Sequence, residues 1–166
     1  EYAAAGIGTE IPREARLAAD YFLRQATDAD GLAAELDTPE RRRRYIADFY
    51  GHRFWSSPGK FSADDIAYMT EPFADADKFR ASIANYEYVG GKRRPSEKPR
   101  FFEQIPVPTL ILYGPDDHVV PADFPARAAV AFPEHIGPFV VPGTGHFIQW
   151  EAADVLNQAL RYFLNP

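Results

Sequence analysis

An acid and a histidine occupy equivalent positions after two short apolar runs in the second half of the chain. Asp117 follows the run Thr109–Gly114, and His146 follows the run Phe139–Val141. A histidine can take a proton from water when a carboxylate holds its other ring nitrogen and stabilises the imidazolium that forms. These two residue types, at these two places, predict a site for proton transfer.

The elements that would position this pair are two buried strands. Both runs are short, apolar and bounded by glycine or proline, as is typical of strands buried on both faces. Helical patterns follow them over Pro125–Phe132 and Ala152–Leu164. The order strand, helix, strand, helix predicts parallel strands with right-handed crossovers. Asp117 and His146 would then meet at the carboxyl edge of the sheet, where the reactive groups of open parallel sheets lie.

Residues around the histidine are expected to set its orientation. Gly143 and Gly145 would let the backbone turn sharply, so that the His146 ring points into the site. Gln149 and Glu151, a few residues further on, are expected to orient the same loop.

The first hundred residues have the pattern of helices. Apolar residues recur at three- and four-residue spacing over Arg13–Gln25, Gly31–Tyr50 and Ser62–Met69. Thr38 before a proline, and Ser62 before two aspartates, are typical of helix N-caps. These ranges predict one layer of helices.

A linker is predicted after this helical part. Residues 90–100 consist of turn formers and charges with almost nothing to bury. We therefore expect two domains. Residues 1–100 would hold a helical cap, with a lead-in and the linker, and residues 101–166 would hold the last two strands and helices of an α/β core.

The composition bounds the class of protein. A chain of 166 residues with 46% hydrophobic and 25% charged positions is long enough for a globular core. The net charge of −6 argues against nucleic-acid binding, which needs a basic face. No apolar run is long enough to cross a bilayer, and the first residues lack the pattern of a secretion signal. We expect a soluble protein, with the cytoplasm favoured, that binds a small apolar molecule.

No cofactor is expected from the sequence. The chain has no cysteine, which excludes thiolate metal ligands and a cysteine nucleophile. His52, His118 and His135 are not paired in any spacing that suggests a metal site.

Two motifs resemble those of the α/β-hydrolase superfamily. Gly114-Pro115-Asp116-Asp117 matches the Gly-x-x-Asp that follows the penultimate strand, and Gly145-His146-Phe147 matches the Gly-His-Phe that follows the last. The resemblance covers about residues 105–166, and its spacing selects Asp117 over Asp116 as the acid. It implies the fold class α/β, here the C-terminal portion of such a core with a helical cap.

The third member of the superfamily's catalytic triad is a nucleophile that precedes the acid in the chain. Neither Gly-x-Ser-x-Gly nor Gly-x-Asp-x-Gly, the patterns that carry it, occurs in the sequence. Two strands are also too few for a stable sheet. We therefore expect a nucleophile-bearing N-terminal half, from the same precursor or from a second chain, as a partner.

The helical part resembles the caps of epoxide hydrolases, in which two tyrosines hold and protonate the epoxide oxygen. The stretch Phe79–Tyr86 is similar to the motif of the second tyrosine, and Tyr21 falls where the first is expected. Tyr88 is the substitute candidate. The predicted catalytic set is thus Asp117, His146, Tyr86 and Tyr21. The residues expected to contact substrate are Phe22, Trp55, Tyr88, His118, Phe147 and Trp150.

This resemblance makes epoxide hydrolysis through an aspartate nucleophile the leading hypothesis. A serine nucleophile would instead indicate an esterase, lactonase or carbon–carbon hydrolase with the same acid and histidine. A haloacetate dehalogenase is less favoured, because Asp20 stands where those enzymes bind halide and would repel it. A hydrolase-derived binding protein, with Tyr21 and Tyr86 as packing residues, is the alternative outside enzymes. The exposed sheet edge also predicts that the chain alone dimerises or aggregates.

Overall fold

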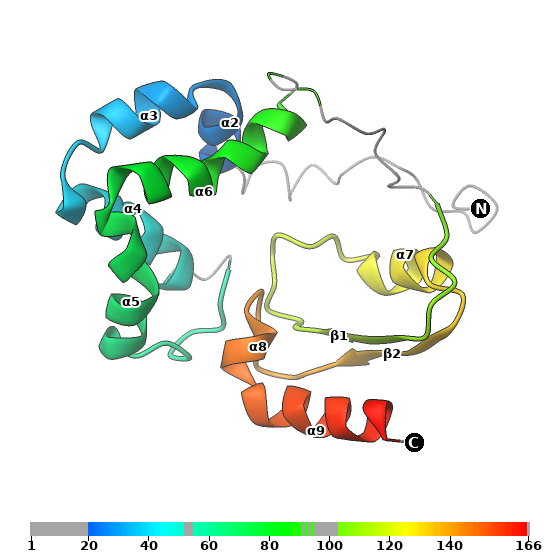
Figure 1. Cartoon of the computed structure of the whole chain (residues 1–166). Coiled ribbons are helices and arrows are strands. Elements are labelled where there is room, and N and C mark those ends of the chain that lie inside the picture. Colours follow the sequence, from blue (N-terminus) through cyan, green and yellow to red (C-terminus); the bar gives the residue numbers. More distant parts are fainter. Residues whose placement is uncertain (1–19, 52–54, 91, 93, 95–102, 166) are drawn as a thin grey trace. The chain divides into compact units, whose positions relative to one another are not determined.

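The computed structural model describes residues 20–51, 55–90, 92, 94 and 103–165. They form two compact units, each of which is described by itself. The helical unit takes in residues 20–51 and 61–94, and the strand-bearing unit takes in residues 55–60 and 103–165 (Figure 1). Residues 55–60, which lie inside the range expected for the cap, thus belong to the unit that contains the strands.

The helical unit is packed around α6 (Ala76–Val89). This helix contacts α2 (Asp20–Thr27), α3 (Ala29–Glu35) and α4 (Pro39–Gly51). A cluster of buried side chains from α3, α4 and α6 forms the core of the unit. The elements are α2 (Asp20–Thr27), α3 (Ala29–Glu35), α4 (Pro39–Gly51), α5 (Ala63–Thr70), a 3₁₀ turn (Glu71–Ala74) and α6 (Ala76–Val89).

Local capping explains where two of these helices begin. The Ser62 hydroxyl accepts a hydrogen bond from the Asp65 backbone N–H, and the Asp65 carboxylate accepts one from the Ser62 backbone N–H. Two N–H groups that have no partner within the helix are thereby satisfied. The Asp75 carboxylate caps α6 by accepting from the Lys78 backbone N–H. The helix start predicted at Ser62 is confirmed.

Two differences from the predicted helices stand out. The helical pattern over Gly31–Tyr50 is divided between α3 and α4. α4 begins at Pro39, directly after Thr38, whose hydroxyl accepts from the Arg41 backbone N–H, so the helix start predicted there is confirmed. α6 was not predicted as an element. Of the helix predicted over Arg13–Gln25, the part before residue 20 lies outside the described residues, as does most of the predicted linker.

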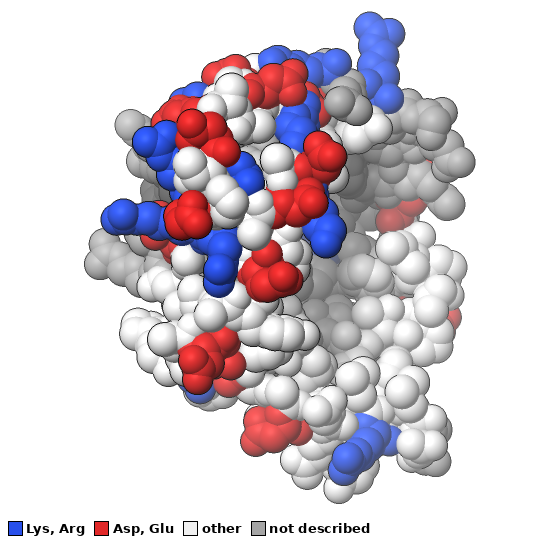
Figure 2. All heavy atoms as spheres, turned by 60° about the vertical axis from the view of Figure 1, so that its left-hand side comes forward, with Lys and Arg blue, Asp and Glu red and all other residues white. Residues whose placement is uncertain are grey.

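The surface of the helical unit carries charges of both signs. Figure 2 shows Lys and Arg side chains interspersed with Asp and Glu rather than gathered in a stripe. Ion pairs account for part of this pattern: Arg24 pairs with Glu35 at 2.8 Å, and Arg80 pairs with Asp30 at 2.7 Å.

The strand-bearing unit contains a parallel pair of strands. β1 (Thr109–Tyr113) pairs with β2 (His135–Val140), and α7 (Phe124–Ala131) connects them. α8 (Ile148–Glu151) and α9 (Ala153–Leu164) follow β2. The predicted order of strand, helix, strand and helix, and with it the α/β fold class, is confirmed.

Two boundaries in this unit were predicted imprecisely. β2 begins at His135, includes Gly137 and Pro138 and ends at Val140, whereas the predicted strand was the run Phe139–Val141. Gly137 has φ +98°, and a Cβ there would lie 2.4 Å from the Ile111 carbonyl oxygen, so the strand passes this point only because the residue is glycine. The helix predicted from Ala152 is preceded by the separate turn α8. None of the described helices is both long and apolar enough to span a membrane.

Candidate catalytic site

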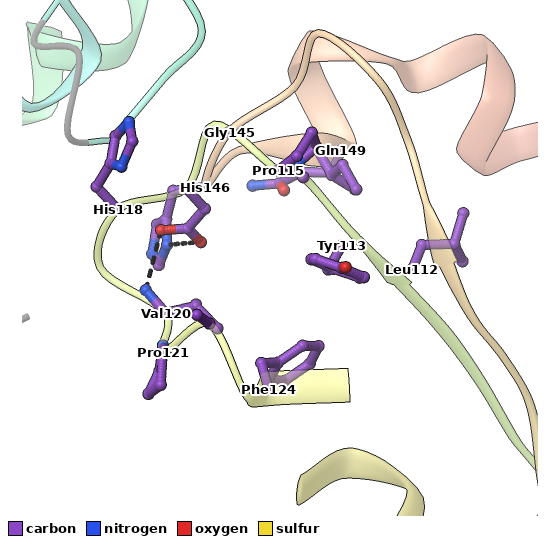
Figure 3. Close-up of a pocket in the computed structure, with 14 residues that line it drawn as sticks. Leu112, Tyr113, Pro115, His118, Val120, Pro121, Phe124, Gly145, His146 and Gln149 are labelled. Atoms are coloured by element: carbon purple, nitrogen blue, oxygen red, sulfur yellow. Dashed lines mark hydrogen bonds and ion pairs between the residues drawn. The ribbon is translucent and has the colours of Figure 1, made fainter. Parts of the chain in front are cut away.

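The strand-bearing unit brings Asp117 and His146 together. Asp117 lies in the loop after β1, and His146 lies in the loop after β2. The His146 Nδ1 atom is 2.9 Å from the Asp117 Oδ2 atom (Figure 3). The Asp117 side chain is 9% exposed and the His146 side chain is 34% exposed. The acid is therefore buried behind a histidine whose outer face remains open.

The second carboxylate oxygen of Asp117 is held by its own loop. Oδ1 accepts hydrogen bonds from the backbone N–H groups of Val119, at 2.9 Å, and Val120, at 3.1 Å. Both oxygens are thus engaged, and the carboxylate plane is fixed. A carboxylate opposite Nδ1 favours the tautomer with a proton on Nδ1, which leaves Nε2 of His146 free to accept one.

Close backbone contact locks the two loops together. The Asp116 backbone N–H donates to the Thr144 carbonyl oxygen at 3.0 Å. A Cβ on Gly114 would lie 2.3 Å from that oxygen, so only glycine fits there. Gly143 has φ +68° and makes the sharp turn expected of it. Gly145 does not have a positive φ; it is needed because a Cβ there would lie 2.6 Å from the Trp55 carbonyl oxygen.

An open hollow of about 630 Å³ borders the pair. The polar residues among those that line it include Asp117, His118, His146 and Gln149. Leu112, Tyr113, Val120, Pro121, Phe124 and Ile148 supply its apolar wall. Figure 3 shows Val120 and Pro121 in the loop after β1, which carries Asp117, and Phe124 at the start of α7. Gln149 lies on the other side of His146. An apolar molecule in this hollow would lie beside a proton acceptor.

The aromatic residues predicted around the histidine have different positions. The Trp55 ring meets the His146 ring edge to face, with centroids 4.7 Å apart, and stacks on Phe147 at 6.0 Å. These two residues support the imidazole and do not border the hollow. Trp150 lies on α8 and is 38% exposed. His118 is exposed and projects from the loop after β1, which also carries Asp117 (Figure 3).

One residue that sequence reasoning missed also contacts this site. The Ser57 hydroxyl donates to the Asp116 carboxylate at 2.7 Å. Ser57 is buried. It lies in the segment 55–60, which separates in the sequence the two stretches of chain that form the helical unit. No local pattern marks it, because its partner is 59 residues away in the sequence.

The helical unit brings the two predicted tyrosines together. Tyr21 on α2 and Tyr86 on α6 have ring centroids 6.0 Å apart, nearly perpendicular at 86°, and a side-chain hydrogen bond joins them. Burial raises the pKa of the Tyr86 phenol, and the hydrogen bond from Tyr21 opposes this only in part. Phe22 packs on Tyr86 with centroids 5.4 Å apart. Tyr88 lies on another face of α6 and is 47% exposed.

Comparison with known proteins identifies the family. The family model described as "alpha/beta hydrolase fold" matches residues 13–153. The chain belongs to this family. Among solved structures, this alpha/beta-hydrolase chain is similar to the epoxide hydrolase CorEH, with a TM-score of 0.74 and 18% identity over 95% of the chain and 54% of that structure. It is also similar to the juvenile hormone epoxide hydrolase of the silkworm Bombyx mori, with a TM-score of 0.62 and 22% identity over 90% of the chain and 41% of that structure.

A curated relative of the alpha/beta-hydrolase chain is named as the hydrolase of an acid. A 2-hydroxy-6-oxo-6-(2'-aminophenyl)hexa-2,4-dienoic acid hydrolase of Metapseudomonas resinovorans is 27% identical over 86 residues, which are 52% of the chain and 29% of that protein. The chain thus spans between about three-tenths and just over half of the length of these similar proteins.

The described part of this alpha/beta-hydrolase chain holds no group of three or more His, Asp or Glu side chains placed to bind a metal ion. The polar side chains in the loops after β1 and β2 instead pair with one another and with backbone N–H groups. The arrangement can accept a proton at His146 and stabilise the resulting charge at Asp117.

Proposed function

We propose that this chain is the cap and the C-terminal core portion of an epoxide hydrolase that adds water to a small apolar epoxide. The observation that carries the proposal is the hydrogen-bonded pair Tyr21 and Tyr86 in the helical unit. Once the hydrogen bond between them gives way to substrate, two neighbouring phenol groups can both donate to one oxygen atom, which stabilises the negative charge that an opening epoxide develops there. The pair Asp117 and His146 supports the hydrolytic half of the reaction.

In the proposed reaction an aspartate on a segment outside these 166 residues attacks an epoxide carbon. The carbon–oxygen bond breaks, an ester forms, and the leaving oxygen takes a proton from a tyrosine hydroxyl. His146 then removes a proton from water at Nε2, the resulting hydroxide attacks the ester, and Asp117 stabilises the imidazolium. The diol leaves, the aspartate is regenerated, and the proton on His146 returns to the tyrosinate through solvent.

The environment of Tyr86 keeps its hydroxyl in the protonated form that a donor needs. Burial raises the pKa of its phenol above the usual value of 10.0, so the proton leaves only when the epoxide oxygen takes on negative charge. Phe22, packed against the Tyr86 ring, adds apolar surface beside the donors. The fold of two epoxide hydrolases, CorEH and the silkworm enzyme, also supports the proposal.

A second candidate is hydrolysis at a carbonyl carbon by a serine nucleophile. The curated relative, a hydrolase of a hexadienoic acid, favours this alternative. Asp117 and His146 would serve a serine in the same way, but the reaction would not depend on two tyrosine hydroxyls.

The test is turnover of styrene oxide by the complete protein, including its nucleophile segment. Tyr86→Phe and Tyr21→Phe each remove one donor, and we expect kcat to fall by about 10²- to 10⁴-fold in Tyr86→Phe. Tyr68→Phe, which changes a tyrosine that is 73% exposed on α5, is the matched control. Styrene oxide turnover that survives both donor substitutions, or a serine at the nucleophile position, contradicts the proposal.

A further inference from the structure

We propose that Glu151 is a positioning residue for His146. Its buried carboxylate holds the loop that carries the histidine and, through the segment 55–57, ties that loop to the one that carries the acid. The role concerns the geometry of the pair Asp117 and His146. Only the kinetic part of its test rests on the function proposed above.

The carboxylate of Glu151 accepts three backbone hydrogen bonds. Oε2 accepts from the N–H of Gly145 at 2.9 Å and from the N–H of Ser57 at 2.8 Å, and Oε1 accepts from the N–H of Phe147 at 2.9 Å. Glu151 is only 7% exposed. The residues immediately before and after His146 are therefore both fixed to one side chain, so the peptide units that flank the histidine cannot tilt independently.

The segment 55–57 extends this bracing to both catalytic loops. The Trp55 carbonyl oxygen accepts from the His146 backbone N–H, and the Trp55 ring packs edge to face against the imidazole. The Ser57 hydroxyl donates to Asp116, the residue next to the acid. Glu151 binds the backbone of this same segment at Ser57. It thus occupies the point where the segment meets the histidine loop.

The chemistry of the three contacts requires a carboxylate. An ionised carboxylate only accepts hydrogen bonds, and charge-assisted bonds from backbone N–H groups are stronger than neutral ones. A glutamine at this position would turn its amide N–H groups toward at least one of the three backbone donors. That donor would lose its partner, and the backbone on one side of His146 would be released.

The first measurement is the tautomer of His146 by long-range ¹H–¹⁵N NMR on the complete protein, including its nucleophile segment, with the His146 signals assigned from His146→Gln. The wild type should show the Nδ1–H tautomer, because Asp117 Oδ2 faces Nδ1. In Glu151→Gln, the ring should lose this partner for part of the time and shift toward the Nε2–H form. Glu151→Asp, which keeps the charge at reduced reach, should give an intermediate population.

Two variants control for nonspecific effects. Asp154→Asn makes the same carboxylate-to-amide change at an exposed position on α9, and it should leave the His146 tautomer unchanged. Ala128→Gly lowers stability by a helix-interior change in α7, remote in the chain from the histidine loop. A merely structural Glu151 would lower the melting temperature as Ala128→Gly does and leave the tautomer unchanged, which would overturn the proposal. A single Nδ1–H tautomer in Glu151→Asp would overturn it as well if the glutamine variant does not fold.

The kinetic measurement follows the ester intermediate in the complete enzyme. Because His146 acts only in the hydrolysis of the ester, Glu151→Gln should lower kcat and KM together, at least tenfold, and the ester should accumulate. A rise in KM with unchanged kcat would place Glu151 in substrate binding and contradict the positioning role. If the enzyme does not open epoxides at all, the proposed function fails, while the tautomer measurement still decides the role of Glu151.

Discussion

At the scale of single residues, the informative feature is that every oxygen of the Asp117 carboxylate has an assigned partner. Oδ1 is occupied by two backbone N–H groups of its own loop, and Oδ2 faces His146. The carboxylate cannot rotate without losing these bonds. Its neighbour Asp116 accepts a hydrogen bond from Ser57 instead of pairing with His146. This difference agrees with the assignment of Asp117 as the acid.

This arrangement determines what Asp117→Asn would do. The amide oxygen would stay on the backbone N–H groups of Val119 and Val120, which can only donate, so the amide NH₂ would face Nδ1 of His146. Nδ1 would become an acceptor, the proton would move to Nε2, and the histidine could no longer take a proton from water. We expect kcat of the complete protein to fall on the order of 10³- to 10⁴-fold, measured as steady-state turnover.

The control for this substitution is Asp123→Asn, in the same segment of the chain. Asp123 pairs with Arg127 at the start of α7 and does not border the hollow at His146. Its substitution should leave turnover within about twofold of the wild type, as surface substitutions away from a site usually do. Equal losses in the two variants would mean that the orientation of Asp117 is not what limits the rate.

At the scale of elements, the sequence predicted the strands and loops that local residue patterns encode. It missed the contacts between segments that are far apart in the chain. The strands, the loops after them and the pair Asp117 and His146 follow from short apolar runs that end in turn formers. Ser57 and Glu151 are 94 residues apart, and a contact at that separation leaves no local signature. α6 could have been predicted, because Phe79, Ile83 and Tyr86 recur at helical spacing.

The helical unit has a predicted pH dependence of its own. Burial is the largest cause that raises the pKa of Tyr45, Tyr50 and Tyr86 above the usual 10.0. A raised pKa means that the folded unit keeps these protons after the unfolded chain has lost them. The contribution of these tyrosines to its free energy of unfolding should therefore be constant below about pH 10 and should fall as the pH rises from there through the folded pKa values.

Thermal melting followed by circular dichroism between pH 8 and pH 11 checks this dependence. Tyr86→Phe removes one of the three groups, so the melting temperature should fall less steeply with pH above 10 than in the wild type. Tyr68→Phe, at an exposed position, should keep the wild-type slope. If Tyr86→Phe also keeps the wild-type slope, then Tyr86 is not buried in the folded protein in the way that its pKa requires.

At the scale of the whole molecule, the strand-bearing unit leaves much apolar surface uncovered. Its two described strands form a sheet with two edges, and β2 exposes Ile136, Phe139 and Val140 by about half. On α9, Tyr162 and Leu164 are 73% and 67% exposed. Exposed strand edges beside apolar surface are sites of strand addition and association. The same surface fits the proposal that a further segment, bearing the nucleophile, extends the sheet.

The 166-residue chain expressed alone should therefore associate with itself, and this can be measured by light scattering after size-exclusion chromatography. We expect dimers or larger species at tens of micromolar protein. Val140→Lys puts a charge on the exposed part of β2 and should shift the distribution toward monomer, because a desolvated charge opposes strand pairing. Tyr68→Lys places the same charge on the helical unit and should have little effect. A sharp monomer peak with a cooperative thermal transition in the wild-type chain would show that the two strands and their helices need no further sheet to be stable.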